Sequence, residues 1–107
     1  MSSLAPLSSA LVILEEFRKI DEEMPAQIAL LIVLIARKPD INFKELGQLT
    51  GLGKSSISRN IGGLSKEVAT GRGLVTFRQD PADRRNMIVK LTPKGQLFID
   101  GMERRLS

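Results

Sequence analysis

A chain of 107 residues can build one modest hydrophobic core but not two, so a single domain over residues 1–107 is expected. The sequence has no cysteine and no histidine, which excludes disulfides, thiol redox sensing and the usual zinc ligands, and removes the commonest general base of enzymes. We therefore expect no catalytic residue, no bound metal and no cofactor.

Positive charge is concentrated in the second half of the chain. The net charge is +4 overall, but residues 1–50 carry 5 Lys or Arg against 7 Asp or Glu, whereas residues 51–107 carry 11 against 5. This distribution favours a polyanionic partner bound by the C-terminal half. The N-terminus lacks a basic start followed by an apolar run and a cleavage site, so a cytoplasmic location without membrane attachment is expected.

Two apolar helices are predicted first. From Leu4 to Ile20, apolar residues recur with a helical period. The apolar face that they form is so wide that one packing partner cannot cover it, and two surfaces have to be buried. Packing within the domain explains one surface, and pairing with a second copy is our preferred explanation of the other. Pro25 suits a first helical position, and the apolar run Ile28–Ala36 is about half as long as a membrane span requires. This apolar run predicts a buried core helix ending at Arg37.

Two short helices joined by a glycine turn follow. Asn42 and Glu45 have the spacing of a capping box, in which each side chain bonds the backbone amide of the other. They predict a helix over Phe43–Thr50. Gly51 can adopt the positive φ that ends such a helix, and Gly53 is an acceptable N-cap for the next one. This arrangement is typical of a helix-turn-helix.

The second of these helices, which begins at Lys54, has two unlike faces. The core face is formed by apolar residues at helical spacing: Ile57, Ile61, Leu64 and Val68. The other face is small, polar and basic, as a helix inserted into a DNA major groove requires. We predict that DNA is contacted by Lys54, Ser55, Ser56, Ser58, Arg59, Asn60 and Lys66. An ordinary solvated face would more often carry Glu-Lys pairs than a cluster of serines.

Gly62 and Gly63 interrupt this predicted helix with two residues of poor helix propensity. Two alternatives stay open at the level of sequence. The pair ends the helix early, or it allows a close approach to the sugar-phosphate backbone.

A β-hairpin with an arginine-rich loop is predicted next. Alternating segments, Leu74–Gln79 and Met87–Leu91, flank a turn-forming segment, Asp80–Asp83. Around this loop lie three arginines suited to phosphates and to a narrow minor groove: Arg78, Arg84 and Arg85. Asp83 is placed to brace either Arg85 or Arg84, which would leave the other arginine to point at DNA.

Thr92 and Pro93 combine an N-cap with a proline at the first helical position, and predict a last helix to about Leu106. The expected order is α-α-α-α-β-β-α, a mainly α fold with a small β-hairpin, which is a winged helix-turn-helix. Residues 1–22 and 93–107 are the expected dimerisation helices.

From about Pro25 to Phe98 the sequence resembles the MarR family of winged-helix regulators. The most specific segments are Gly73-Leu74-Val75, Asp80-Pro81-Ala82-Asp83-Arg84-Arg85 and Leu91-Thr92-Pro93-Lys94-Gly95. The resemblance implies a homodimer, a recognition helix over Lys54–Lys66, Arg84 or Arg85 in a minor groove, and repression by occupying a promoter. The terminal helices are shorter than is usual in the family, which leaves little wall for an effector pocket, so a small-molecule effector is not favoured.

Two functions fit these features. The leading one is a dimeric repressor that reads a pseudo-palindromic operator in double-stranded DNA. The alternative is a winged-helix module that binds another protein and has no sequence-specific DNA binding. An enzyme is not expected, because no set of residues combines a nucleophile with a base or with metal ligands.

Overall fold

The computed structural model describes residues 4–66 and 73–107. In chain order, the elements are α1 (Ala5–Ile20), α2 (Ala26–Arg37), β1 (Ile41–Asn42), α3 (Phe43–Thr50), α4 (Lys54–Ser65), β2 (Val75–Gln79), β3 (Met87–Leu91) and α5 (Pro93–Leu106). This architecture is mainly helical and confirms the predicted winged helix-turn-helix. Val68, predicted to continue the core face of α4, lies outside the described residues.

Strand β1 is an element that the sequence analysis missed. It has only two residues, too few for an alternating pattern, and it forms because it meets a strand from the far end of the chain. Ile41 pairs with Val89 and Asn42 with Ile88, while β2 pairs with the other edge of β3, all antiparallel. The sheet order is therefore β1-β3-β2, and the hairpin is tied to the start of the helix-turn-helix.

The core forms where α2, α3 and α4 meet one face of this sheet. Helix α2 is the apolar run predicted to be buried, and Leu31, Ile32 and Ile35 are almost fully enclosed. The other enclosed side chains come from α1, the helix-turn-helix and the sheet, and include Phe17, Ile41, Leu46, Ile57, Ile61, Val75 and Val89. No helix in residues 4–66 and 73–107 combines the length and apolarity needed to cross a membrane.

The entry into the helix-turn-helix follows half of the predicted capping box. Asn42 Oδ1 accepts a hydrogen bond from the Glu45 backbone nitrogen at 2.7 Å. The return bond predicted from Glu45 is wrong: its carboxylate binds Lys38 Nζ at 2.8 Å, since a charged donor is a stronger partner than a backbone amide. Pro25 likewise caps α2 rather than occupying its first helical position.

Glycine is required at two turns of this fold. Gly51 ends α3 with a φ of 77°, as predicted, and its nitrogen donates to the Gly47 carbonyl at 2.8 Å. At Gly95, a Cβ atom would overlap the carbonyl of Leu74. The first turn of α5 thus packs directly on the chain that enters β2. Thr92 fixes this junction, because its hydroxyl accepts from Gly95 N at 3.1 Å and donates to Gly73 O at 2.6 Å.

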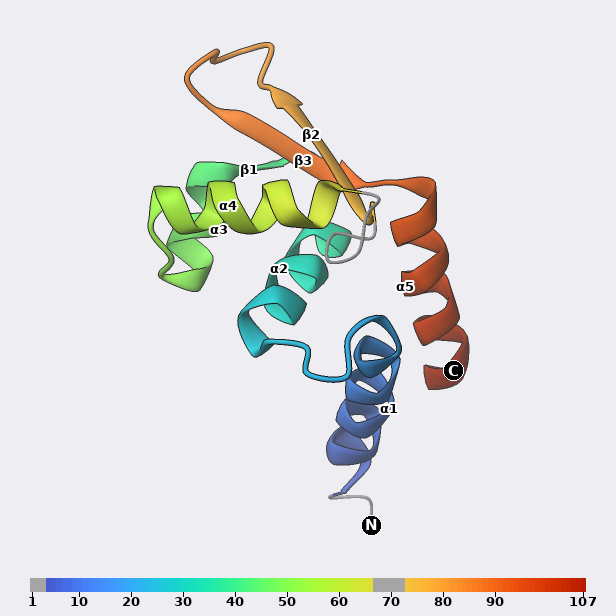
Figure 1. Ribbon diagram of the computed structural model, residues 1–107. Helices are drawn as coiled ribbons and strands as arrows, with labels where there is room; N and C mark the ends of the chain where they lie inside the picture. Colours follow the sequence, from blue (N-terminus) through green and yellow to red (C-terminus); the bar gives the residue numbers. More distant parts are fainter. Residues whose placement is uncertain (1–3, 67–72) are drawn as a thin grey trace.

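Helices α1 and α5 pack together away from the hairpin loop (Figure 1). The rings of Phe17 and Phe98 lie 5.3 Å apart between their centroids. Beside them, Glu16 is only 6% exposed and accepts hydrogen bonds from Lys19 Nζ at 2.7 Å and from Arg105 Nη1 at 2.8 Å. These two bonds, that from Lys19 first, lower the pKa of Glu16. The described part of the N-terminal helix is thereby attached to the C-terminal one.

Part of the remaining surface of α1, extended by its N-cap residue Leu4, is apolar and exposed. Its stripe of leucines, each 58–66% exposed, consists of Leu4, Leu7, Leu11 and Leu14. The structure therefore agrees with the prediction that packing within the domain leaves part of this wide apolar face bare.

Candidate nucleic-acid interface

The predicted contact residues lie mainly on α4 and on the hairpin loop. In Figure 1 these two parts occupy the upper half of the molecule, whereas α1 and the end of α5 occupy the lower half. The turn at residues 51–53 and the strand pairing of β3 with β1 place both parts on the same small core. One end of the molecule thus carries both predicted DNA-contacting elements.

Helix α4 presents the two faces that the sequence predicted. Ile57, Ile61 and Leu64 are buried and hold it on the core. The exposed residues of the predicted contact set are Lys54, Ser55, Ser58, Arg59 and Lys66, and Ser56 is half-buried at the edge of the face. Lys66 is the C-cap residue, just beyond the last turn of the helix.

Asn60 departs from this set. It is half-buried, and its Nδ2 atom is enclosed without a hydrogen-bond partner among the described residues. Position 60 lies three residues after Ile57 and four before Leu64, so it shares their side of the helix. The polar character of asparagine hid this placement from an analysis of residue types alone.

The glycine pair does not end α4. The helix continues through Gly62 and Gly63 to Ser65, so the alternative of an early end is wrong. Its last turn is held from both sides, because Ser65 Oγ donates to Gly62 O at 2.8 Å and Leu74 N donates to Leu64 O at 3.0 Å.

The hairpin loop is ordered by its own aspartates. Asp80 Oδ1 accepts from the backbone nitrogen of Ala82 at 2.9 Å, and Asp83 Oδ1 accepts from that of Arg85 at 3.1 Å. Asp80 N also donates to Asn86 O at 3.0 Å across the base of the loop. Such side-chain turns hold an irregular segment in one conformation.

Within this loop, Asp83 faces Arg85. Its Oδ1 atom lies 3.6 Å from Arg85 Nε, although the arginine side chain is 94% exposed. Arg84 is exposed, and among the described residues no hydrogen bond or ion pair engages its guanidinium. Of the two braces that the sequence left open, the structure has Asp83 with Arg85, and Arg84 is the arginine left available.

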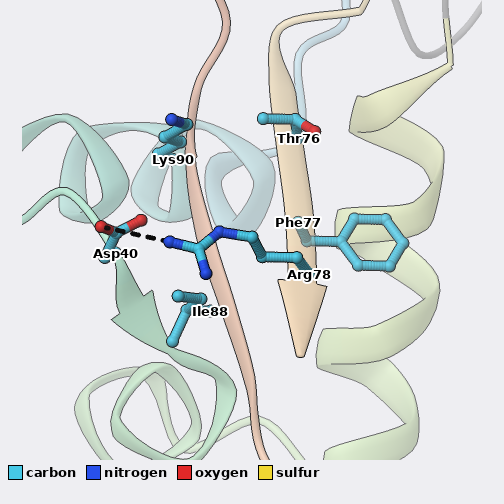
Figure 2. Close-up of a pocket in the computed structure, with 6 residues that line it drawn as sticks. All are labelled: Asp40, Thr76, Phe77, Arg78, Ile88 and Lys90. Atoms are coloured by element: carbon cyan, nitrogen blue, oxygen red, sulfur yellow. Dashed lines mark ion pairs between the residues drawn. The ribbon is translucent and has the colours of Figure 1, made fainter. Parts of the chain in front are cut away.

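Arg78 lies apart from the loop arginines, on the outer face of the sheet. Figure 2 shows its side chain extending across β3 toward Asp40, whose Oδ2 atom is 4.0 Å from Nη2. The neighbouring Phe77 points the other way and meets Phe43 at 6.0 Å between ring centroids. Alternation along a strand explains this separation of adjacent residues.

The outer face of the sheet has a basic pocket that the sequence analysis did not predict. Its lining, drawn in Figure 2, consists of Asp40, Thr76, Phe77, Arg78, Ile88 and Lys90. Lys90 joins Arg78 here because Thr76 pairs with Lys90 and Arg78 with Ile88, which puts all four on one face. The alternation of β2 and β3 contained this signal, although Arg78 was predicted to contact DNA together with the two arginines of the loop.

Comparison with known proteins identifies the family. Residues 24–86 match the sequence profile of the MarR family. The chain belongs to the MarR family. The match includes α2, the helix-turn-helix and the hairpin loop, so it covers the elements that carry the candidate interface. MarR-family proteins are DNA-binding transcription regulators, not enzymes.

Solved structures of other proteins have the same fold, and several of them are described as MarR regulators. The Thermotoga maritima regulator Tm0710 is 27% identical, with a TM-score of 0.66 over 91% of this chain and 66% of that one. RV1404 from Mycobacterium tuberculosis is 20% identical, with a TM-score of 0.75 over 95% and 66%. Bordetella bronchiseptica BpsR, whose DNA binding is regulated by 6-hydroxynicotinic acid, is 18% identical, with a TM-score of 0.60 over 92% and 75%. No curated protein sequence matches this MarR-family chain significantly.

Proposed function

We propose that this MarR-family chain is a dimeric transcription repressor that binds a pseudo-palindromic operator in double-stranded DNA. Helix α4 enters the major groove and Arg84 of the hairpin loop enters the adjacent minor groove. The observation that carries the proposal is the presence of the basic face of α4 and the arginine loop at one end of the molecule. A DNA duplex is wider than either element, so a single duplex can contact both of them.

The outer face of α4 suits base recognition. Ser55 and Ser58 are short and exposed, so the helix can lie deep in the groove, where hydroxyls bind phosphates or base edges. Arg59 is the long exposed side chain in the middle of this face and can donate two hydrogen bonds to one guanine. We assign base selectivity to Arg59 and backbone contacts to the serines.

The hairpin loop suits a minor groove. The bonds of Asp80 and Asp83 hold its backbone in place before DNA arrives, which reduces the entropy lost on binding. Arg84 is not engaged within the described structure, and arginine is favoured in narrow, strongly negative minor grooves. Arg85 is held nearer to Asp83 and is assigned to the neighbouring phosphates.

The dimer is assigned to the leucine stripe of α1. Leu4, Leu7, Leu11 and Leu14 are separated by three, four and three residues, which is the spacing of the apolar positions in a helical heptad. A second copy offers an identical stripe and closes the pair about a two-fold axis. Two recognition helices then meet half-sites about one helical turn, roughly 10 bp, apart.

A small-molecule effector is not part of this proposal. Regulation of DNA binding by 6-hydroxynicotinic acid is a property of BpsR, and we do not extend it to this chain.

The proposal is tested by selecting bound sequences from random DNA and then measuring fluorescence anisotropy with the selected operator and a scrambled duplex. We expect tighter, salt-dependent binding of the operator. Arg59→Ala should reduce operator affinity about tenfold or more and relax the preference at one base pair. Arg104→Ala, which removes an exposed arginine at the end of α5, is the matched control and should change affinity less than twofold.

Equal affinity for operator and scrambled DNA across the salt series would contradict sequence-specific regulation. The alternative function, a module that binds another protein, would be favoured by a separate result. In that case, Arg59→Ala and Arg84→Ala leave DNA binding unchanged but abolish capture of the protein partner.

A further inference from the structure

Gly62 and Gly63 occupy the interior of α4, where glycine is among the least favourable residues. Glycine loses more backbone freedom on folding than any other residue, and alanine is the best helix former. A helix that keeps two adjacent glycines therefore needs a reason for them, either within the fold or at a surface that it contacts.

The described fold gives no such reason. Among the described residues, a Cβ atom built at Gly62 or at Gly63 meets no atom within 4 Å beyond its chain neighbours and the helix's own backbone. Neither residue has the positive φ seen at Gly51 and Gly73. The contrast with Gly95 is clear, since a Cβ there overlaps the Leu74 carbonyl. Alanine at positions 62 and 63 is compatible with every contact that the structure describes.

The space outside these two residues belongs to the proposed DNA-binding face. Gly62 follows Arg59 by three residues and Gly63 follows it by four, so both lie beside it on the next turn. Lys66 is exposed just beyond them, at the end of the helix. The pair thus exposes bare helix backbone between two positive side chains, Arg59 and Lys66.

From this arrangement we infer that Gly62 and Gly63 are the point of closest contact between α4 and a DNA strand. The sugar-phosphate backbone packs against the main chain of α4 at these residues, with Arg59 on one side and Lys66 on the other. A methyl group at either position would push the strand away from the helix. The inference rests on the proposed function and adds two positioning residues to it.

The test substitutes alanine at each glycine and measures thermal stability and operator affinity together. Gly62→Ala and Gly63→Ala should each raise Tm by about 4 °C or more, because alanine favours the helix in an open site. Each should also weaken operator binding at least fivefold, and the double variant should weaken it further. A variant that is more stable yet binds less well cannot owe its weaker binding to unfolding.

Gly101→Ala in α5 is the matched control. Gly101 also lies inside a helix, and a Cβ there would have only ordinary contact with the side chain of Arg104, at 3.7 Å. This control should raise Tm without changing operator affinity or the dimer mass in solution.

Each remaining outcome is decisive. Unchanged affinity in the stabilised glycine variants would overturn the inference while leaving the proposed function intact. A lower Tm would also overturn it, because the fold itself would then require glycine. If the unsubstituted protein selects no DNA sequence, the proposed function itself is wrong. That result differs from unchanged affinity in the glycine variants, so failure of the proposed function and failure of the inference are distinguished.

Discussion

Helices α4 and α1 both pack an apolar side against the domain, but the surfaces that they expose differ in chemical character. Each buries one apolar side against the domain, with Ile57 and Ile61 on α4 and Phe17 on α1. The outer side of α4 is small, polar and basic, whereas that of α1 carries four exposed leucines. A surface that water solvates well is suited to a charged partner, and one that water solvates poorly is suited to another apolar surface. The proposed DNA contact and the proposed dimer contact thus lie at opposite ends of one small domain.

The two regions also differ in how they are held. Helix α4 is part of the central core, with the turn at Gly51 before it and the sheet beside it. Helix α1 depends on α5, through the Phe17–Phe98 contact and the bonds of Arg105 to Glu15 and Glu16. In the proposed dimer, changes to the leucine stripe of α1 should therefore affect assembly. Changes inside the arm formed by α1 and α5 should affect its stability, and changes around α4 should affect DNA binding.

The largest effect is expected from charge on the leucine stripe. Leu7→Asp combined with Leu11→Asp should weaken self-association at least a hundredfold, because each buried leucine contributes about 1.5–3 kcal/mol and the stripe occurs in both copies. Sedimentation equilibrium measures this. Leu49→Asp, a leucine of α3 that is 57% exposed, is the control and should leave the dimer unchanged. A monomeric unsubstituted protein at operator-binding concentrations would refute the assignment of α1 to the dimer.

The next largest effect is expected at Arg84 of the hairpin loop, and not at Arg78 of β2. Arg84→Ala should reduce operator affinity about tenfold and remove any preference for A·T pairs beside the half-site, as expected for an arginine in a narrow minor groove. Arg78→Ala should change affinity less than twofold, because its side chain is directed toward Asp40 on the outer face of the sheet. Anisotropy titrations with both variants test this. A larger loss for Arg78→Ala than for Arg84→Ala would reverse the two roles.

A smaller effect is expected at the start of the helix-turn-helix. Asn42→Ala removes the cap on α3 and should lower the free energy of unfolding by about 1 kcal/mol. Urea denaturation measures it. Asn42→Asp retains an acceptor oxygen and should recover most of the loss. Equal destabilisation by both variants would mean that the cap bond is not the stabilising feature.

The smallest effect concerns acid stability of the arm. The pKa of Glu16 is lowered from its ordinary value of 4.5 by its bonds with Lys19 and Arg105, so ionised Glu16 stabilises the fold above that pH. This stabilisation is lost as the pH falls through the lower folded value. The stability difference between the unsubstituted protein and Glu16→Gln should thus be constant near neutrality and shrink below about pH 4.5. Denaturation at several pH values checks it, and a difference independent of pH would contradict it.

Local features of the sequence predicted most of the fold. The caps at Asn42 and Thr92, the turn at Gly51 and the apolar period of α4 act between residues at most four apart, and all were found in the structure. The pattern of the hairpin loop also placed β2 and β3 within a residue of their observed bounds. In the candidate interface, the predicted exposure of Arg59 and Arg84 agrees with the structure.

What sequence reasoning missed involves partners that are distant along the chain or roles that residue type conceals. Strand β1 exists only because β3 lies beside it, and Glu45 binds Lys38 rather than the amide of Asn42. The inward placement of Asn60 depends on which side of α4 meets the core. In each case several partners compete for one residue or segment, and secondary-structure propensity does not predict which partner it contacts.

The amino-acid sequence by itself determined the order of the helices, the position of the turn between α3 and α4, and the chemistry of the face that α4 exposes. Those properties depend on backbone preference and periodicity, which act over one or two helical turns. The tertiary structure alone decided that Arg78 turns toward Asp40, that Arg105 reaches Glu16 from 89 residues away, and that no residue in the described ranges fills the space beside Gly62 and Gly63. Those properties depend on which atoms meet after the chain has folded, and spacing along the sequence does not specify that.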